Sequence, residues 1–132
     1  MKLLLWIALG SGLGGACRYG LDELALALGG DAFPLSTLFI NISGSLLIGV
    51  LAGRWATGGA VKPPAERWHF WMTGVCGGYT TFSTFSWQLL EMMQLGHGQA
   101  AGFYGAASVG FGLIAVWLGL SIGVRKHAPA SE

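Results

Sequence analysis

The chain has 132 residues, of which 53% are hydrophobic and 10% are charged, and its formal net charge at pH 7 is +1. Soluble domains carry about 25% charged residues, so this composition excludes an ordinary water-soluble fold. The near-neutral charge gives no basic surface for nucleic acid, and we expect no nucleic-acid partner. Because one bilayer span needs about 20 mainly apolar residues, we predict an all-α membrane protein in which residues 1–132 form a single domain of four transmembrane helices.

The first two predicted helices cover residues 3–28 and 35–55. A Gly-Gly-Asp sequence at residues 29–31 separates them, and Pro34 precedes the second, where proline suits a first helical turn. Arg18 is the only basic residue well inside a predicted span. It is either a charge that attracts anions, the partner of a carboxylate one turn later, or a side chain that extends to the interface.

The third and fourth predicted helices cover residues 66–94 and 99–124. The third contains Gly-Val-Cys-Gly-Gly at residues 74–78, followed by threonine, serine and phenylalanine residues, and this composition is unfavourable for a continuous helix. We therefore predict that the third helix is broken near its centre, at residues 77–81.

Each predicted helix also contains two glycines four residues apart, which lets helix backbones approach closely in lipid. These pairs are Gly10 and Gly14, Gly49 and Gly53, Gly74 and Gly78, and Gly119 and Gly123.

The predicted break is rich in hydroxyl side chains and aromatic rings. Non-helical backbone at membrane depth is tolerated only inside protein or along a wet cavity, where freed carbonyls can hold a cation. Phe82 and Phe85, three residues apart, project from one helix face and can present ring edges to an anion. Two alternatives remain: a kink stabilised by serine and threonine bonds to their own helix, and phenylalanines that are ordinary core residues.

Two further helix faces carry polar side chains at four-residue spacing. Thr37, Asn41 and Ser45 form one row, and Tyr104 and Ser108 form the other. The amide and hydroxyl groups can donate to an anion in transit, or they can hold helices together by hydrogen bonds.

The chain resembles the Fluc/CrcB fluoride channels over essentially its whole length. The motifs that carry the resemblance are GSGLGGACRY at residues 10–19, STLFINISGSLLIG at residues 36–49 and GGYTTFSTFS at residues 77–86. The resemblance implies an antiparallel, dual-topology homodimer in the plasma (inner) membrane, with two pores. Fluoride would leave the cytoplasm passively through them, which protects the cell from fluoride toxicity.

The resemblance also implies roles for individual residues. The implied fluoride-pore residues are Asn41, Phe82, Phe85, Tyr104, Ser108, Thr37, Ser83 and Thr84. Backbone carbonyls of Gly77 and Thr80 from both subunits would hold a structural Na⁺ at the dimer interface, and Arg18 matches a family arginine without a settled role. The chain departs from the pattern at Gln88, where some relatives carry an acid, and at Gly112, which replaces a hydroxyl residue one turn beyond Ser108.

The basic residues complicate the expected dual topology, which needs nearly balanced charge on the two membrane sides. Six basic residues fall on one side: Lys2, Arg54, Lys62, Arg67, Arg125 and Lys126. The positive-inside rule then predicts cytoplasmic termini. The partner is either a second, inverted copy of this chain or an oppositely oriented homologue. We expect the homodimer, because the pore and cation motifs are intact in this chain.

The main alternative function is a proton-coupled exporter of the small multidrug type, which needs a carboxylate on the translocation path. The candidates, Glu23 and Glu91, both lie near predicted span ends. A third alternative is a non-transporting assembly subunit. No nucleophile, base and orienting group occur together, so we do not expect an enzyme.

Overall fold

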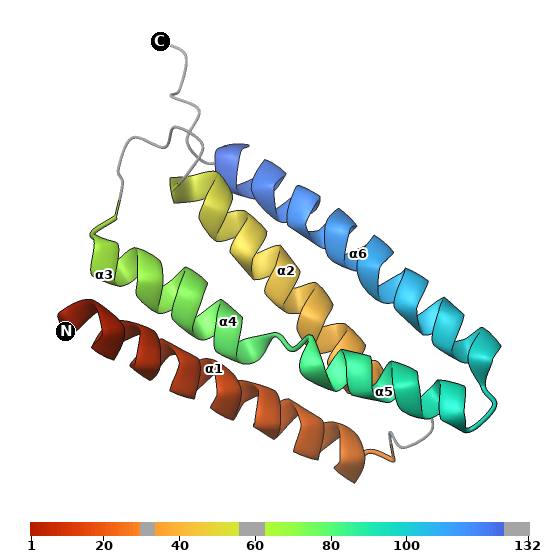
Figure 1. Cartoon of the computed structure of the whole chain (residues 1–132). Helices are drawn as coiled ribbons and strands as arrows, with labels where there is room; N and C mark the ends of the chain where they lie inside the picture. The colour runs from red at the N-terminus through yellow and green to blue at the C-terminus, as the bar shows by residue number, and fades with distance from the viewer. Residues whose placement is uncertain (30–33, 56–62, 126–132) are drawn as a thin grey trace.

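The computed structural model describes residues 1–29, 34–55 and 63–125 (Figure 1). All regular structure in these ranges is helical: α1 (Lys2–Ala27), α2 (Leu35–Trp55), α3 (Ala65–Trp68), η1 (His69–Cys76), α4 (Gly77–Tyr79), α5 (Ser83–Gln94) and α6 (Gly98–Arg125). The all-α prediction is confirmed. The predicted connections at residues 30–31 and 57–62 and the basic residues Lys62 and Lys126 lie outside the described residues.

Two of the helices are long and apolar enough to cross a membrane by length and composition. They are α2 and residues 98–124 of α6, with mean hydropathies of 1.9 and 2.0 in their most apolar stretches. Large apolar side chains on the outer surface of α6, such as Phe103, Leu113 and Trp117, are more than half exposed. Contact with lipid removes the cost of exposing such side chains to water, so these features are those of a membrane protein.

Close glycine contacts join α1 to the segment formed by η1 and α4, which runs beside it in Figure 1. A Cβ atom added to Gly10 would collide with the carbonyl oxygen of Phe70 and would lie 3.0 Å from the Cα atom of Gly74. A Cβ atom at Gly14 would collide with the carbonyl oxygen of Val75. The two helices can approach this closely because both surfaces lack side chains there.

A second pair of helices, α2 and α6, packs in the same way. A Cβ atom at Gly49 would lie 2.5 Å from the carbonyl oxygen of Val116, and one at Gly53 would lie 2.6 Å from that of Leu120. Gly119 and Gly123 face back toward α2 at the same points. The prediction that the four glycine pairs mediate close helix packing is confirmed.

The third predicted helix is broken, as expected, but the predicted bounds of the break, residues 77–81, are too early, because Gly77–Tyr79 is still helical. The helix that begins at Ala65 passes through the π-helical segment η1 and ends at Tyr79, the end of α4. Thr80 then adopts an extended conformation with ψ of 157°, and α5 begins at Ser83. The break therefore lies at residues 80–82, next to α2.

Candidate functional site

The Asn41 side chain of α2 binds the backbone at the break. Its amide nitrogen Nδ2 donates to the carbonyl oxygen of Thr81 at 2.9 Å, and the Thr81 N–H donates to Asn41 Oδ1, also at 2.9 Å. An unsatisfied peptide group costs several kcal/mol in a bilayer, and Asn41 satisfies both polar groups of this residue. Of the two roles predicted for Asn41, the helix-to-helix bond is formed. Because Nδ2 carries a second hydrogen, Asn41 can still donate to another acceptor.

Two amide groups at the break donate to side chains instead of to the helix. In a continuous α-helix, the Thr81 N–H would bond to the carbonyl of Gly77, and the Thr84 N–H to that of Thr80. Here the Thr81 N–H donates to Asn41, and the Thr84 N–H donates to Thr81 Oγ1 at 3.1 Å. The carbonyls of Gly77 and Thr80, the two implied Na⁺ ligands, therefore lose their helical donors.

Hydroxyl groups stabilise the break from within the same segment. Thr81 Oγ1 donates to Thr84 Oγ1 at 3.0 Å and lies 3.3 Å from Ser83 Oγ. The hydroxyl groups of Thr80 and Ser86 donate to carbonyls four residues earlier in their own segments, both at 2.9 Å. The predicted alternative, a kink stabilised by serine and threonine, thus occurs together with the Asn41 bonds.

Three aromatic rings form a row from the surface to the interior. The ring centroids of Phe82 and Phe85 are 5.9 Å apart, and those of Phe85 and Tyr104 are 5.3 Å apart. Phe82 is 80% exposed, whereas Tyr104 is fully buried. Because Phe82 is so exposed in the single chain, it is not an ordinary core residue.

Polar side chains surround the buried end of this row. The Tyr104 hydroxyl donates to Gln88 Oε1 at 2.8 Å and lies beside the side chains of Thr37 and Ser108. Thr37 is buried, and Ser108 Oγ is buried without a hydrogen-bond partner among the described residues. A hydroxyl in this position has a donor hydrogen available for a small acceptor.

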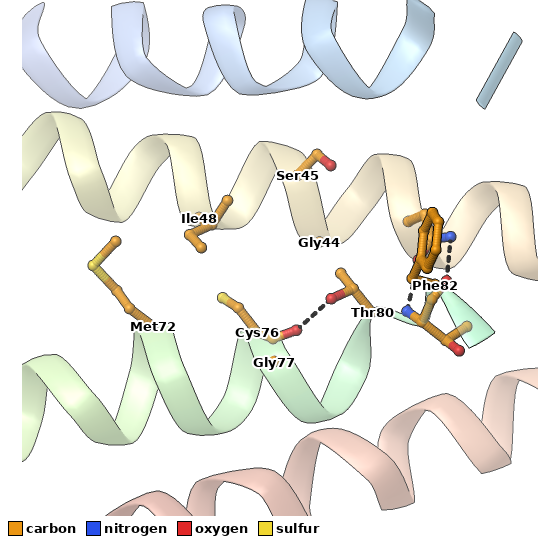
Figure 2. Close-up of a pocket in the computed structure, with 10 residues that line it drawn as sticks. Gly44, Ser45, Ile48, Met72, Cys76, Gly77, Thr80 and Phe82 are labelled. Carbon is orange, nitrogen blue, oxygen red and sulfur yellow. Dashed lines mark hydrogen bonds between the residues drawn. The ribbon is translucent and has the colours of Figure 1, made fainter. Parts of the chain in front are cut away.

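A cavity of about 320 Å³ lies between α2 and the broken helix, as Figure 2 shows. Met72, Cys76 and Thr80 extend from the broken helix toward α2, and Ile48 of α2 extends toward them. Ten residues line the cavity, and none is charged: Asn41, Gly44, Ser45, Ile48, Met72, Cys76, Gly77, Thr80, Thr81 and Phe82. Asn41 and Phe82 connect this cavity with the row of rings. Phe82 is the exposed end of the row, and Asn41 bonds to Thr81, the residue before Phe82.

Arg18 and Asp22 are both half-buried and lie one turn apart on α1. The structure forms no ion pair between these two described residues, so one of the three alternatives for Arg18, the bond to a carboxylate one turn later, is not made. Arg18 follows Gly14 by one turn, and Gly14 contacts Val75 and Tyr79. This spacing puts Arg18 on the same face of α1 as Gly14, one turn closer to the break in the neighbouring helix.

The site contains residues that sequence reasoning did not assign to it. Thr81 is central to the break, Gln88 accepts the bond from Tyr104, and Ser43 Oγ lies 2.9 Å from the Tyr79 hydroxyl. Ser43 and Thr81 could have been assigned to the site from the sequence, because both occur among other hydroxyl residues.

Comparison with known proteins gives consistent matches. Residues 5–120 match the family model described as "CrcB-like protein, Camphor Resistance (CrcB)". A protein of Rhodospirillum rubrum is 48% identical over 87% of this chain and 89% of its own length. Proteins of Paramagnetospirillum magneticum and Beijerinckia indica are 45% and 44% identical, over 86% and 92% of this chain and 88% and 96% of their own lengths. All three are named "Fluoride-specific ion channel FluC".

Proposed function

The chain belongs to the CrcB family, and on this basis we propose that it is a fluoride-selective ion channel. Fluoride leaves the cytoplasm through it, passively and down the electrochemical gradient, and the cell is thereby protected from fluoride toxicity. The names of its relatives are those of ion channels, so the protein is not an enzyme. The observation that best supports the proposal is the row of rings that leads to the buried hydroxyl groups of Tyr104 and Ser108.

The chemistry of the row suits a small anion that must both enter and leave. The edges of Phe82 and Phe85 carry partial positive charge, and the second Nδ2 hydrogen of Asn41 and the Ser108 hydroxyl are neutral donors. A lysine or arginine would hold fluoride too firmly for rapid exit. Thr37, Ser83, Thr84 and Tyr104 supply further hydroxyl groups near the same path.

A second copy of the chain, inverted in the membrane, completes each pore in this proposal. In the single chain, Phe82 and Ser83 are exposed, and a Cβ atom at Gly77 would meet nothing within 4 Å. The Ser83 hydroxyl lies 3.3 Å from Thr81 Oγ1, and lipid offers it no further hydrogen bond, which supports contact with another protein surface. The intact break and ring row in this one chain favour a homodimer over a pair with an oppositely oriented homologue.

We further propose that a structural Na⁺ lies where the two copies meet. The diverted amides of Thr81 and Thr84 support this, because they free the carbonyls of Gly77 and Thr80. Na⁺ is a hard cation that takes oxygen ligands, and two carbonyls from each copy would give four.

The proposed location is the plasma (inner) membrane, which the chain crosses four times. α1 has 26 residues, and at 1.5 Å per residue it is about 39 Å long, more than the hydrocarbon core requires. The broken helix would cross with its break near the bilayer centre, where its polar groups face protein and the cavity.

A proton-coupled exporter is not supported. The comparisons lead to fluoride channels, and the two carboxylates considered for such a mechanism, Glu23 and Glu91, are exposed and do not line the cavity. A proton-coupled exporter needs a titratable carboxylate on its path, and no carboxylate lines this cavity.

Reconstituted liposomes test the proposed mechanism. Vesicles are loaded with potassium fluoride, diluted into fluoride-free buffer at equal pH, and treated with valinomycin so that charge can be balanced by potassium. A channel releases fluoride under these conditions and releases no more when a pH gradient is added. Release that requires the pH gradient would refute the channel mechanism.

A further inference from the structure

A second cavity lies away from the break, at the end of the molecule where α1 and α3 begin. Its volume is about 390 Å³, within the range of small-molecule sites. Figure 1 shows the first turns of α1 and α3 side by side at this end. Six residues line the cavity: Trp6, Pro64, Glu66, Arg67, Phe70 and Trp71.

The walls of this cavity are aromatic. The rings of Trp6 and Phe70 meet edge to face at 5.8 Å, and those of Phe70 and Trp71 do so at 5.3 Å. Trp6 and Trp71 nevertheless remain 44% and 38% exposed. Tryptophan concentrates at the level of lipid headgroups, and both helices that carry these residues begin here. The cavity thus lies at the membrane–water interface of the proposed topology.

The two charges at the cavity are of opposite sign. Arg67 and Glu66 are adjacent and exposed, and both contribute to its lining. A guanidinium group binds phosphate with two parallel hydrogen bonds, whereas a carboxylate and aromatic faces attract an ammonium group. A zwitterionic headgroup matches this pair, while Glu66 repels a headgroup with only negative charge.

We propose that this cavity is a binding site for the headgroup of a zwitterionic aminophospholipid, of the phosphatidylethanolamine type. Arg67 binds the phosphate, Glu66 binds the ammonium, and the upper acyl chain lies against Trp6 and Trp71. The inference rests on the proposed membrane insertion, because it requires the start of α1 to reach the headgroup layer.

The full-length protein in nanodiscs of equal parts phosphatidylethanolamine and phosphatidylglycerol tests the site. Lipids that stay bound after transfer to detergent are identified by native mass spectrometry. We expect the wild type to retain phosphatidylethanolamine with roughly fivefold preference, the effect of one charge interaction near a membrane surface. Glu66→Gln should remove this preference, and Arg67→Gln should reduce retention of both lipids.

Glu91→Gln is the matched control, because Glu91 is an exposed acid on α5 and does not line this cavity. It should keep the wild-type preference. Equal retention of the two lipids by the wild type, or an unchanged preference in Glu66→Gln, would overturn the lipid site. Fluoride efflux from liposomes that contain the same purified protein is the separate readout. Its loss in a wild type that keeps the lipid preference contradicts the channel alone.

Discussion

Asn41 makes one of the two interactions that the sequence left as alternatives, the bond between helices, and it keeps a hydrogen that could serve the other. Its amide bonds both polar groups of Thr81, and one Nδ2 hydrogen remains beyond those bonds. Asn41→Ala leaves a peptide N–H and a carbonyl without partners, which should destabilise the protein by about 1–3 kcal/mol per group. We expect a lower Tm in detergent together with slower fluoride efflux.

Ser121→Ala serves as the control for Asn41→Ala, because the Ser121 hydroxyl donates only within its own helix, to the carbonyl of Trp117. Its Tm and efflux should match those of the wild type. If Asn41→Ala instead kept the wild-type Tm, the break would not depend on this side chain.

Ser45 can supply the hydroxyl that α6 lacks at Gly112. Tyr104, Ser108 and Gly112 follow one another at four-residue spacing, and a Cβ atom on Gly112 would lie 3.7 Å from Ser45 Oγ, an ordinary contact. Ser45→Ala should slow fluoride efflux by roughly fivefold to tenfold, the value of about one hydrogen bond.

Adding Gly112→Ser to Ser45→Ala should restore most of the lost efflux, because the new hydroxyl occupies the neighbouring position on α6. A double variant as slow as Ser45→Ala would show that Ser45 acts in some other way.

Sequence spacing singled out most residues of the candidate site, because polar side chains are rare in these helices. Thr37, Asn41 and Tyr104 stand out among mainly apolar residues. The structure places Thr37 beside Tyr104 and the ring of Phe85 5.3 Å from that of Tyr104. Thr81 and Gln88 were not assigned, because their partners depend on how far the chain turns at the break.

At the scale of helices, the glycine pairs decide how closely the elements approach. Gly123→Ala would put a Cβ atom 2.5 Å from the carbonyl oxygen of Val50, and backbone cannot move aside easily. We expect a loss of stability of about 1–3 kcal/mol from overpacking, measured as a lower Tm in detergent.

Gly20→Ala is the matched substitution for Gly123→Ala, since a Cβ atom at Gly20 meets nothing within 4 Å. It should raise the Tm slightly, because alanine favours the helix by up to about 1 kcal/mol. Equal effects of the two substitutions would contradict close packing of α2 and α6.

The break itself could be predicted, but its π-helical approach could not. Glycine and hydroxyl residues weaken a helix locally, and this signal is visible in the sequence at residues 74–86. The π-helical segment η1 packs closely against α1 at Gly10 and Gly14, a contact between segments far apart in the sequence. Side-chain periodicity over only eight residues does not distinguish a π-helix from an α-helix.

At the scale of the whole molecule, the proposed dimer makes a prediction about orientation. A single cysteine at Lys2, in a background with Cys17→Ser and Cys76→Ser, reports the side of the N-terminus. An inverted homodimer exposes about half of these cysteines to an impermeant maleimide added outside intact cells, despite the one-sided basic residues. No labelling before lysis would instead support pairing with an oppositely oriented homologue.

The assembly is the part that one chain could not predict from its own residues. The exposure of Phe82 and Ser83 indicates that another protein surface covers them. The proposed orientation of that partner rests only on the family resemblance. The fold within the chain follows instead from local patterns of apolar, glycine and hydroxyl residues.

The central claim is that an uncharged path of ring edges and neutral donors conducts fluoride selectively. Its most direct test uses liposomes loaded with equal fluoride and chloride, with separate electrodes for the two ions after addition of valinomycin. We expect rapid loss of fluoride while chloride stays inside. Retention of fluoride, or release of both ions at similar rates, would contradict it.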